Sequence, residues 1–275
     1  MGCRRLFLAG VLLALPICSP LASGSVSRRG LIVGGDEVPG SPHPFIVSLQ
    51  NRNRHFCGGT LLDSQHVLTA AHCEGHVKCT GEICEGVEVN VFRHNISKLA
   101  EDEFPGCSQV IRGEKWVSHP DYTGSPRHTH DMAVLRLEHP VRPFASACRQ
   151  YGISLGATSS VTTTFNWLSS SHRVAAGSQL HAMGWGRMWA DGPQSPVLRE
   201  VAIDAIMYSE CNRAWVHLDE TQICAYGGAA RTRDVCNGDS GGPLLVPGTN
   251  LQVGIMSFSH KCGDANFPAV FVRDP

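Results

Sequence analysis

The chain has 275 residues, and its 23 Lys+Arg and 24 Asp+Glu residues give a formal net charge of −1 at pH 7. A chain of this length can bury a large core, either as one domain or as two closely joined halves. The balanced charge provides no basic field, so we predict that nucleic acid is not a partner.

The first residues have the order of a secretory signal peptide. Basic residues precede the apolar run Leu6–Ile17, and small residues follow it up to Gly24. The run is interrupted by Pro16 and is shorter than the roughly 20 apolar residues that span a bilayer. We therefore predict a signal peptide over residues 1–24 and a secreted, extracellular protein that is not bound to a membrane.

The twelve cysteines of an exported chain indicate disulfides rather than metal sites. Cys3 and Cys18 would leave with the signal peptide. Cys79 and Cys84 lack a nearby cysteine or histidine pair at zinc-finger spacing. We expect no metal site and no cofactor.

From residue 45 onward the chain consists of short apolar runs broken by Gly, Pro, Asn and Asp, with almost no helical periodicity. β-rich runs of strand length predict an all-β sandwich or barrel. The clearest predicted strands are Phe45–Leu49, His66–Thr69, Val87–Phe92, Met132–Leu137, Leu244–Val246 and Gln252–Ser257.

Two further segments are read from composition and motif. Asn95-Ile96-Ser97 is an acceptor sequence for N-glycosylation, which fits a surface loop of a secreted protein. The Ser/Thr-rich insertion between Leu155 and Arg173 predicts a flexible loop, to which we assign no role.

A serine lies between glycines in the stretch 236–243, which reads Cys-Asn-Gly-Asp-Ser-Gly-Gly-Pro. Glycines permit backbone angles that a Cβ would forbid, so this peptide can turn tightly and aim its N–H groups at one point. A serine on such a turn can act as an exposed nucleophile, with the N–H groups of Gly238 and Ser240 donating to a developing oxyanion. The stretch therefore predicts a nucleophile at Ser240.

Other motifs accompany this octet, and together they resemble the trypsin/chymotrypsin-like serine protease family from Ile32 to Val272. The resemblance implies two six-stranded antiparallel β-barrels with the active site between them. Relatives continue past the strand Ala269–Val272 into a C-terminal helix. Because this sequence stops at Asp274-Pro275, we expect that helix to be lacking. The motifs are Ile32-Val33-Gly34-Gly35, Leu68-Thr69-Ala70-Ala71-His72-Cys73, the segment His130–Leu137 and Gly184-Trp185-Gly186.

The resemblance assigns the catalytic roles. It makes His72 the general base, since an imidazole has an ordinary pKa near neutrality. It makes Asp131 the acid that fixes the tautomer of His72 and stabilises the imidazolium. The order His, Asp, Ser along the chain agrees with this family and differs from the order of α/β-hydrolases.

The resemblance also implies three disulfides, which are Cys57–Cys73, Cys211–Cys224 and Cys236–Cys262. It leaves three connectivities for Cys79, Cys84, Cys107 and Cys148. Cys148 falls where many relatives bind a propeptide cysteine, a role open to Cys18 only if signal cleavage occurs earlier than predicted. Arg93 occupies a position that supplies a calcium ligand in some relatives, so we expect no calcium there.

A zymogen is implied as well. In the family, cleavage before the isoleucine of the Ile-Val-Gly-Gly motif frees an α-amino group that pairs with the aspartate preceding the nucleophile. Here these residues are Ile32 and Asp239, which gives a propeptide over residues 25–31 and a protease domain over 32–275. Leu31 stands where relatives carry Arg or Lys. We therefore predict cleavage after Leu31, or after Arg29 with later removal of the two residues between.

The resemblance places Asp234 at the floor of the primary specificity pocket, where a carboxylate selects a substrate cation and Arg can pair with it through two hydrogen bonds. Ser257 and Ser259 would form the strand edge that binds the substrate backbone. Ser259 and Ala269 stand where trypsin-like enzymes usually have glycines, and Val235 stands where they commonly have serine. These side chains narrow the pocket. Because Asp234 lies at its floor, we predict cleavage after Arg or Lys, with Arg preferred.

These inferences predict a secreted, monomeric serine endopeptidase that acts on proteins or peptides through an acyl-enzyme and is open to protein protease inhibitors. A protease-like secreted binding protein with little or no activity is the alternative. The unusual activation site, the crowded pocket and the short C-terminus are its motivation.

Overall fold

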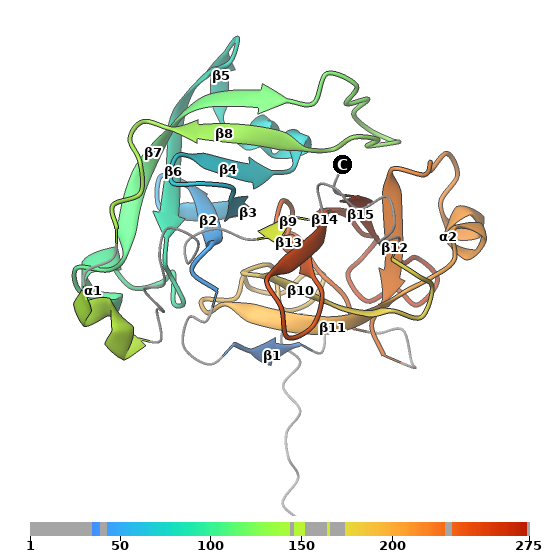
Figure 1. Cartoon of the computed structure of the whole chain (residues 1–275). Coiled ribbons are helices and arrows are strands. Elements are labelled where there is room, and N and C mark those ends of the chain that lie inside the picture. Colours follow the sequence, from blue (N-terminus) through green and yellow to red (C-terminus); the bar gives the residue numbers. More distant parts are fainter. Residues whose placement is uncertain are drawn as a thin grey trace, which may run out of the picture.

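The structure is a computed structural model that describes residues 35–38, 43–143, 146–151, 164–165, 174–228 and 233–273. Within these residues the chain folds into two antiparallel β-barrels that lie one above the other in Figure 1. No helix in this described part of the chain combines the length and the apolar character needed to cross a membrane.

The first barrel closes because β2 pairs with both β3 and β6. Its six strands run in the order β2-β3-β4-β8-β7-β6, and β5 pairs with β6 outside this ring. The bounds are β2 (Ile46–Asn51), β3 (Arg54–Leu61), β4 (His66–Thr69), β5 (Lys78–Thr80), β6 (Ile83–Val91), β7 (Gln109–Ser118) and β8 (Ala133–Leu137).

The second barrel closes through the pairing of β11 with β12. Its six strands run in the order β11-β10-β13-β14-β15-β12, while β1 pairs with β11 and the short β9 pairs in parallel with β14. The bounds are β1 (Asp36–Glu37), β9 (Thr164–Phe165), β10 (Gln179–Gly184), β11 (Arg199–Ala205), β12 (Gln222–Tyr226), β13 (Pro243–Leu245), β14 (Leu251–Phe258) and β15 (Ala269–Arg273).

Helices are short and connect strands in the described residues. They are the 3₁₀ turns η1 (Ala71–His76) and η2 (Ser146–Tyr151) and the α-helices α1 (Ala100–Glu103) and α2 (Tyr208–Ala214).

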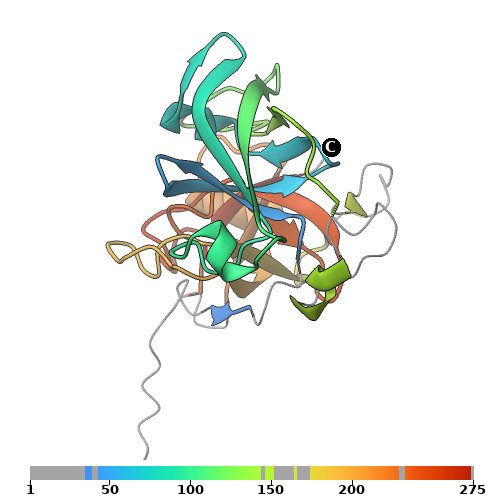
Figure 2. The same cartoon turned by 90° about the vertical axis from the view of Figure 1, so that its left-hand side faces the viewer.

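The β5–β6 hairpin extends from the end of the molecule opposite β1 in both Figure 1 and Figure 2.

The two barrels share an apolar core. The larger buried cluster joins side chains of the first barrel to Trp185, Leu198 and Leu245, which belong to the second half of the chain. A smaller cluster fills the second barrel around Leu244 and Phe271. Because packed interiors resist deformation, the shared core holds the two barrels, and the residues between them, in a fixed relation.

The expected fold class is confirmed, since both barrels have six antiparallel strands in a closed ring. Each of the predicted strands falls on an observed strand, and the ends differ by at most four residues, as at Val87 against Ile83 of β6. β15 ends at Arg273 and is the last element of the described chain.

Five disulfides connect the ten cysteines of the described residues. Three of them join Cys57 to Cys73, Cys211 to Cys224 and Cys236 to Cys262. The sequence left the other pairing open, and the structure joins Cys79 to Cys84 and Cys107 to Cys148. Cys79 and Cys84 are also register partners across the β5–β6 hairpin.

Candidate active site

The serine-bearing turn lies where the two barrels meet. Gly238 has φ 103°, a left-handed conformation that favours glycine. The backbone N–H of Gly58 in β3 donates to the Ser240 carbonyl at 2.8 Å, and the N–H of Gly241 donates to the Met256 carbonyl in β14 at 2.8 Å. The turn is therefore tied to both barrels, and Ser240 is half-buried.

His72 and Asp131 are brought together by the pairing of β4 with β8, in which Thr69 lies opposite Ala133. His72 follows β4 on η1, and Asp131 lies just before β8. The Nδ1 of His72 lies 2.7 Å from Asp131 Oδ2, and the His72 backbone N–H donates to Asp131 Oδ1 at 2.9 Å. Two residues that are far apart in sequence thus form one bidentate contact.

Asp131 is fully buried and is stabilised as a carboxylate. Burial by itself raises the pKa of Asp131, but the hydrogen bond and charge of His72, with a hydrogen bond from the Ser257 hydroxyl, outweigh it and hold the pKa below its ordinary value. The Ser257 side chain donates to Asp131 from β14, and the role predicted for the strand edge at Ser257 in binding the substrate backbone stays a prediction.

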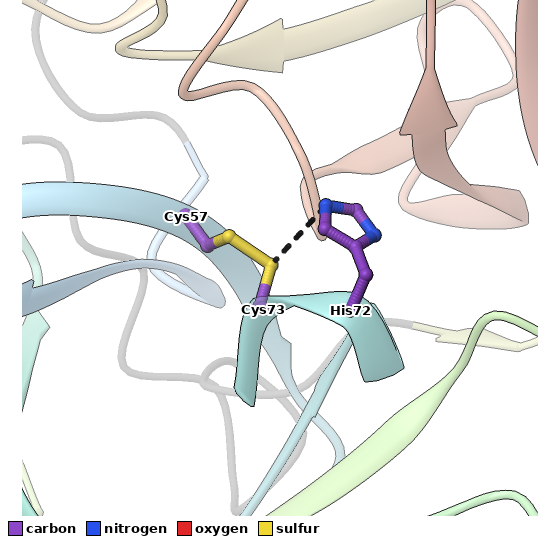
Figure 3. Close-up of side chains that lie close together, drawn as sticks. All are labelled: Cys57, His72 and Cys73. Carbon is purple, nitrogen blue, oxygen red and sulfur yellow. Dashed lines mark hydrogen bonds between the residues drawn. A yellow bond between two sulfur atoms is a disulfide. The ribbon is translucent and has the colours of Figure 1, made fainter. Parts of the chain in front are cut away.

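Figure 3 shows the His72 ring beside the Cys57–Cys73 disulfide. The Nε2 of His72 lies 3.9 Å from Cys73 Sγ. Among the described residues, the Ser240 hydroxyl makes no hydrogen bond to His72. In unliganded enzymes such bonds are often long and shorten when substrate binds.

The two N–H groups predicted as oxyanion donors donate to no acceptor within the described chain. The turn uses the N–H groups of Asp239, Gly241 and Gly242 for its own hydrogen bonds, whereas those of Gly238 and Ser240 donate to no described residue. Two free N–H groups on one tight turn can donate to an anionic oxygen.

His55 supports this turn, and sequence analysis missed it. Its Nε2 lies 2.8 Å from the Gly238 carbonyl and its Nδ1 lies 2.8 Å from the Ser48 hydroxyl. Burial lowers the pKa of His55 to about 4, although the bond to Gly238 acts in the opposite direction. The neutral ring therefore donates to Gly238 and accepts from Ser48. Its place in β3, far from the serine in sequence, gave no local signal.

Asp239 lies inside the molecule behind the turn. It is 1 % exposed and accepts the N–H groups of Gly186 at 2.7 Å and Cys236 at 2.8 Å. Burial raises its pKa to about 6. A Cβ at Gly186 would lie 2.3 Å from an Asp239 carboxylate oxygen, so the Gly-Trp-Gly motif is required by this close approach. Ile32, its predicted partner, lies outside the described residues.

Asp234 is buried near the same turn. It accepts the N–H groups of Val235 at 2.8 Å and Gly263 at 2.7 Å. Burial raises its pKa to about 7, against the lowering effect of these two bonds. Ala269 is buried and packs in the cluster that contains Val235, whereas Ser259 is partly exposed and donates to the Val235 carbonyl at 3.4 Å.

The loop between β6 and β7 carries a buried cation. The Arg93 guanidinium donates to Glu103 Oε2 at 2.8 Å and to Asn90 Oδ1 at 2.7 Å. It also donates to the carbonyls of Asn95 and Lys98. A permanent positive charge fills the centre of this loop, where the sequence predicted no calcium. Asn95 is half-buried, and its Oδ1 accepts from Ser97.

A double β-barrel with a His–Asp pair on the first barrel and a serine-bearing turn tied to both barrels has the architecture of a serine endopeptidase. The model of the Trypsin family matches residues 32–274, and the chain belongs to this family.

Named relatives agree with this assignment. The chain is 33% identical over 253 residues to the venom protease of Bombus pensylvanicus, covering 88% of this chain and 94% of that one. It is 34% identical over 273 residues to the venom serine protease Bi-VSP of Bombus ignitus, covering 94% of this chain and 69% of that one. Among solved structures, mouse neuropsin superposes with a TM-score of 0.68 at 25% identity, covering 87% of this chain and 93% of that one. The protein is a trypsin-like serine endopeptidase that acts on protein substrates.

Proposed function

We propose that this protease is secreted as a zymogen and cleaves after Arg or Lys, with Ser240 as nucleophile, His72 as general base and Asp131 as the acid that orients it. The contact of His72 Nδ1 with Asp131 Oδ2 at 2.7 Å, next to the turn that bears Ser240, carries this proposal.

Each step of the reaction follows from these contacts. Because Nδ1–H donates to Asp131, the Nε2 of His72 is free to accept the Ser240 proton as the hydroxyl attacks the substrate carbonyl. The N–H groups of Gly238 and Ser240 stabilise the oxyanion. The imidazolium then protonates the leaving amine. Water next attacks the acyl-enzyme while His72 takes its proton, and His72 returns this proton to the Ser240 oxygen as the carboxylic acid product leaves.

Asp234 supplies the preference for a cation. In the empty pocket its carboxyl group has a pKa of about 7, so cleavage after Arg should increase as the pH rises through 7 and the carboxylate forms. A peptide panel with Arg, Lys, Phe and Ala before the scissile bond tests this preference. Asp234→Ser should lower kcat/KM for Arg substrates and leave Phe substrates much less affected. A wild-type preference for Phe or Ala contradicts the proposal.

Activation frees the α-amino group of Ile32, which pairs with Asp239. The support is the state of Asp239, a buried carboxylate that accepts only two backbone N–H groups among the described residues, because a buried carboxylate without a cation is costly. We propose a signal peptide over 1–24, a propeptide over 25–31 and a mature domain over 32–275. Sequencing the N-terminus of the active protein tests this, and an active form that begins at Gly30 contradicts it.

Covalent labelling separates an enzyme from an inactive binding protein. A fluorophosphonate probe should label the processed protein at Ser240, and Ser240→Ala should abolish labelling. Ser209→Ala, which changes an exposed serine on α2, should label like the wild type. Absence of labelling after correct processing would favour a binding role.

A further inference from the structure

A second histidine lies beside the His72–Asp131 pair. One ligand atom from each of His72, His128 and Asp131 lies within 4.8 Å of the others. The two other groups of this kind in the described residues depend on the sulfurs of Cys57 and Cys73 or of Cys79 and Cys84. These sulfurs are in disulfides and provide no thiolate. Only the histidine pair with Asp131 has three available ligands in the described chain.

The fold holds His128 in this position from both barrels. His128 lies in the turn between β7 and β8 with φ 48°, and its N–H donates to the Gly124 carbonyl at 2.8 Å. The side chain of Gln222 in β12 donates to the carbonyls of Arg127 at 2.9 Å and His128 at 3.4 Å. The His128 ring packs on Phe258 at a centroid distance of 5.3 Å.

The cluster is reachable from solvent. The side chains of His72 and His128 are 22% and 20% exposed, whereas Asp131 is fully buried. The Tyr122 hydroxyl lies 3.2 Å from His128 Nδ1.

The distances match a tetrahedral ion after small movements. Bonds of about 2.0–2.1 Å from zinc to nitrogen or oxygen place neighbouring ligand atoms roughly 3.3 Å apart. His72 Nδ1 is 2.7 Å and His128 Nδ1 is 3.9 Å from Asp131 Oδ2. To bind the ion, the distance from Asp131 Oδ2 to His72 Nδ1 therefore increases, and the distance to His128 Nδ1 decreases, each by about half an ångström.

We propose that His72, His128 and Asp131 form a reversible Zn²⁺ site that switches the protease off. Two imidazoles and a carboxylate suit Zn²⁺ and not Ca²⁺ or Mg²⁺, which prefer oxygen ligands. The ion replaces the Nδ1 proton of His72, and this proton moves to Nε2 of the same ring. The ring keeps its neutral charge, but Nε2 no longer accepts the Ser240 proton.

Calorimetry on the processed Ser240→Ala protein measures binding without activity. We expect one Zn²⁺ per chain and no Ca²⁺ at this site. Adding His128→Gln should weaken zinc binding at least tenfold. Adding His119→Gln should leave it unchanged, because His119 stacks on His130 and is not in the cluster. Equal zinc affinity in the His128→Gln protein, or no zinc binding to Ser240→Ala, overturns the proposal.

The inhibition, unlike the binding, rests on the proposed function. In the wild type, Zn²⁺ should block fluorophosphonate labelling, a chelator should restore it and Ca²⁺ should have no effect. If the His128→Gln protein does not fold, this comparison of metals still decides, because labelling that is indifferent to Zn²⁺ overturns the switch. Absence of labelling without any metal would instead refute the proposed function and leave the calorimetry to test the site.

Discussion

At the scale of single residues, the turn that bears Ser240 depends on groups behind it as well as on its own glycines. His55 is the clearest case, because its neutral ring holds the Gly238 carbonyl and so fixes the peptide plane between Gly238 and Asp239. This plane lies between the two peptides that carry the N–H groups of Gly238 and Ser240. The geometry proposed to stabilise the oxyanion is thus set partly from β3.

Replacing His55 with Leu should lower kcat about 10- to 100-fold with little change in KM, because a displaced donor is felt mainly in the transition state. His66→Leu is the matched control, since His66 is on the neighbouring strand β4 with a side chain 40% exposed, and should keep normal kinetics. Steady-state kinetics normalised by active-site titration measure the effect. A change confined to KM would contradict this account.

Two buried groups, Asp239 and His55, make the free energy of unfolding of the precursor depend on pH in opposite directions. Asp239 has an ordinary pKa of 3.8 and a folded pKa of about 6, so its contribution is full below pH 3.8 and is lost as the pH rises through 6. His55 has an ordinary pKa of 6.5 and a folded pKa of about 4. Its contribution is full above pH 6.5 and is lost as the pH falls through 4.

Replacing one group at a time shows how much that group contributes to the pH dependence of the free energy of unfolding. As the pH rises from 4 to about 6, the Asp239 contribution to the free energy of unfolding is lost in the wild type, so the Asp239→Asn precursor should lose less. Asp234, whose pKa is also raised, still lowers the stability with rising pH in both proteins. The His55→Gln precursor should lose stability less as the pH falls from 6.5 to 4. Urea unfolding across this range measures both, and parallel curves for all three proteins would refute the assignment.

At the scale of elements, the loop between β6 and β7 is organised around one buried ion pair. Arg93 and Glu103 have side chains only 3% and 4% exposed, and the Glu103 carboxylate also accepts the N–H groups of His94 and Asn95. Removing one partner of a buried pair leaves an uncompensated charge.

Arg93→Met should therefore lower the free energy of unfolding by about 3–5 kcal/mol. The pair Arg136–Glu114 on β7 and β8 is the control, because its side chains are 43% and 40% exposed. Arg136→Met should cost less than about 1 kcal/mol. Denaturant unfolding of both variants compares them, and equal losses would show that burial does not decide the outcome.

At the scale of the whole molecule, glycines allow a close contact between the first barrel and the turn that leads into the second. A Cβ on Gly58 in β3 would lie 3.0 Å from the Gly242 Cα, which is backbone and cannot turn aside. Gly58→Ala should push the barrels apart by a few tenths of an ångström, lower the free energy of unfolding by about 1–3 kcal/mol and reduce kcat/KM at least tenfold. A Cβ on Gly75 would meet no atom within 4 Å, so Gly75→Ala should leave both the stability and kcat/KM unchanged. An active, stable Gly58→Ala protein would contradict this description.

Apolar periodicity predicted an all-β protein and the positions of its strongest strands, since local patterns carry that information. The two six-stranded barrels were predicted from the family resemblance. Through the family motifs, sequence reasoning also proposed Ser240, His72 and Asp131. It missed His55, His128 and Gln222, because their contacts join segments that lie far apart in sequence and leave no local pattern. It left Cys107 and Cys148 unassigned, since only the folded chain shows which cysteines are neighbours.

The Cys107–Cys148 disulfide closes a covalent ring with a sequence separation of 41, and the exposed Arg127 lies inside it. Under the proposed cleavage after arginine, self-digestion at Arg127 would open this ring without releasing either piece of the chain. The two pieces stay linked and migrate together until a reductant is added. Because His72 lies before the cut and Asp131 and Ser240 lie after it, the nicked molecule still carries all three groups on one covalent framework.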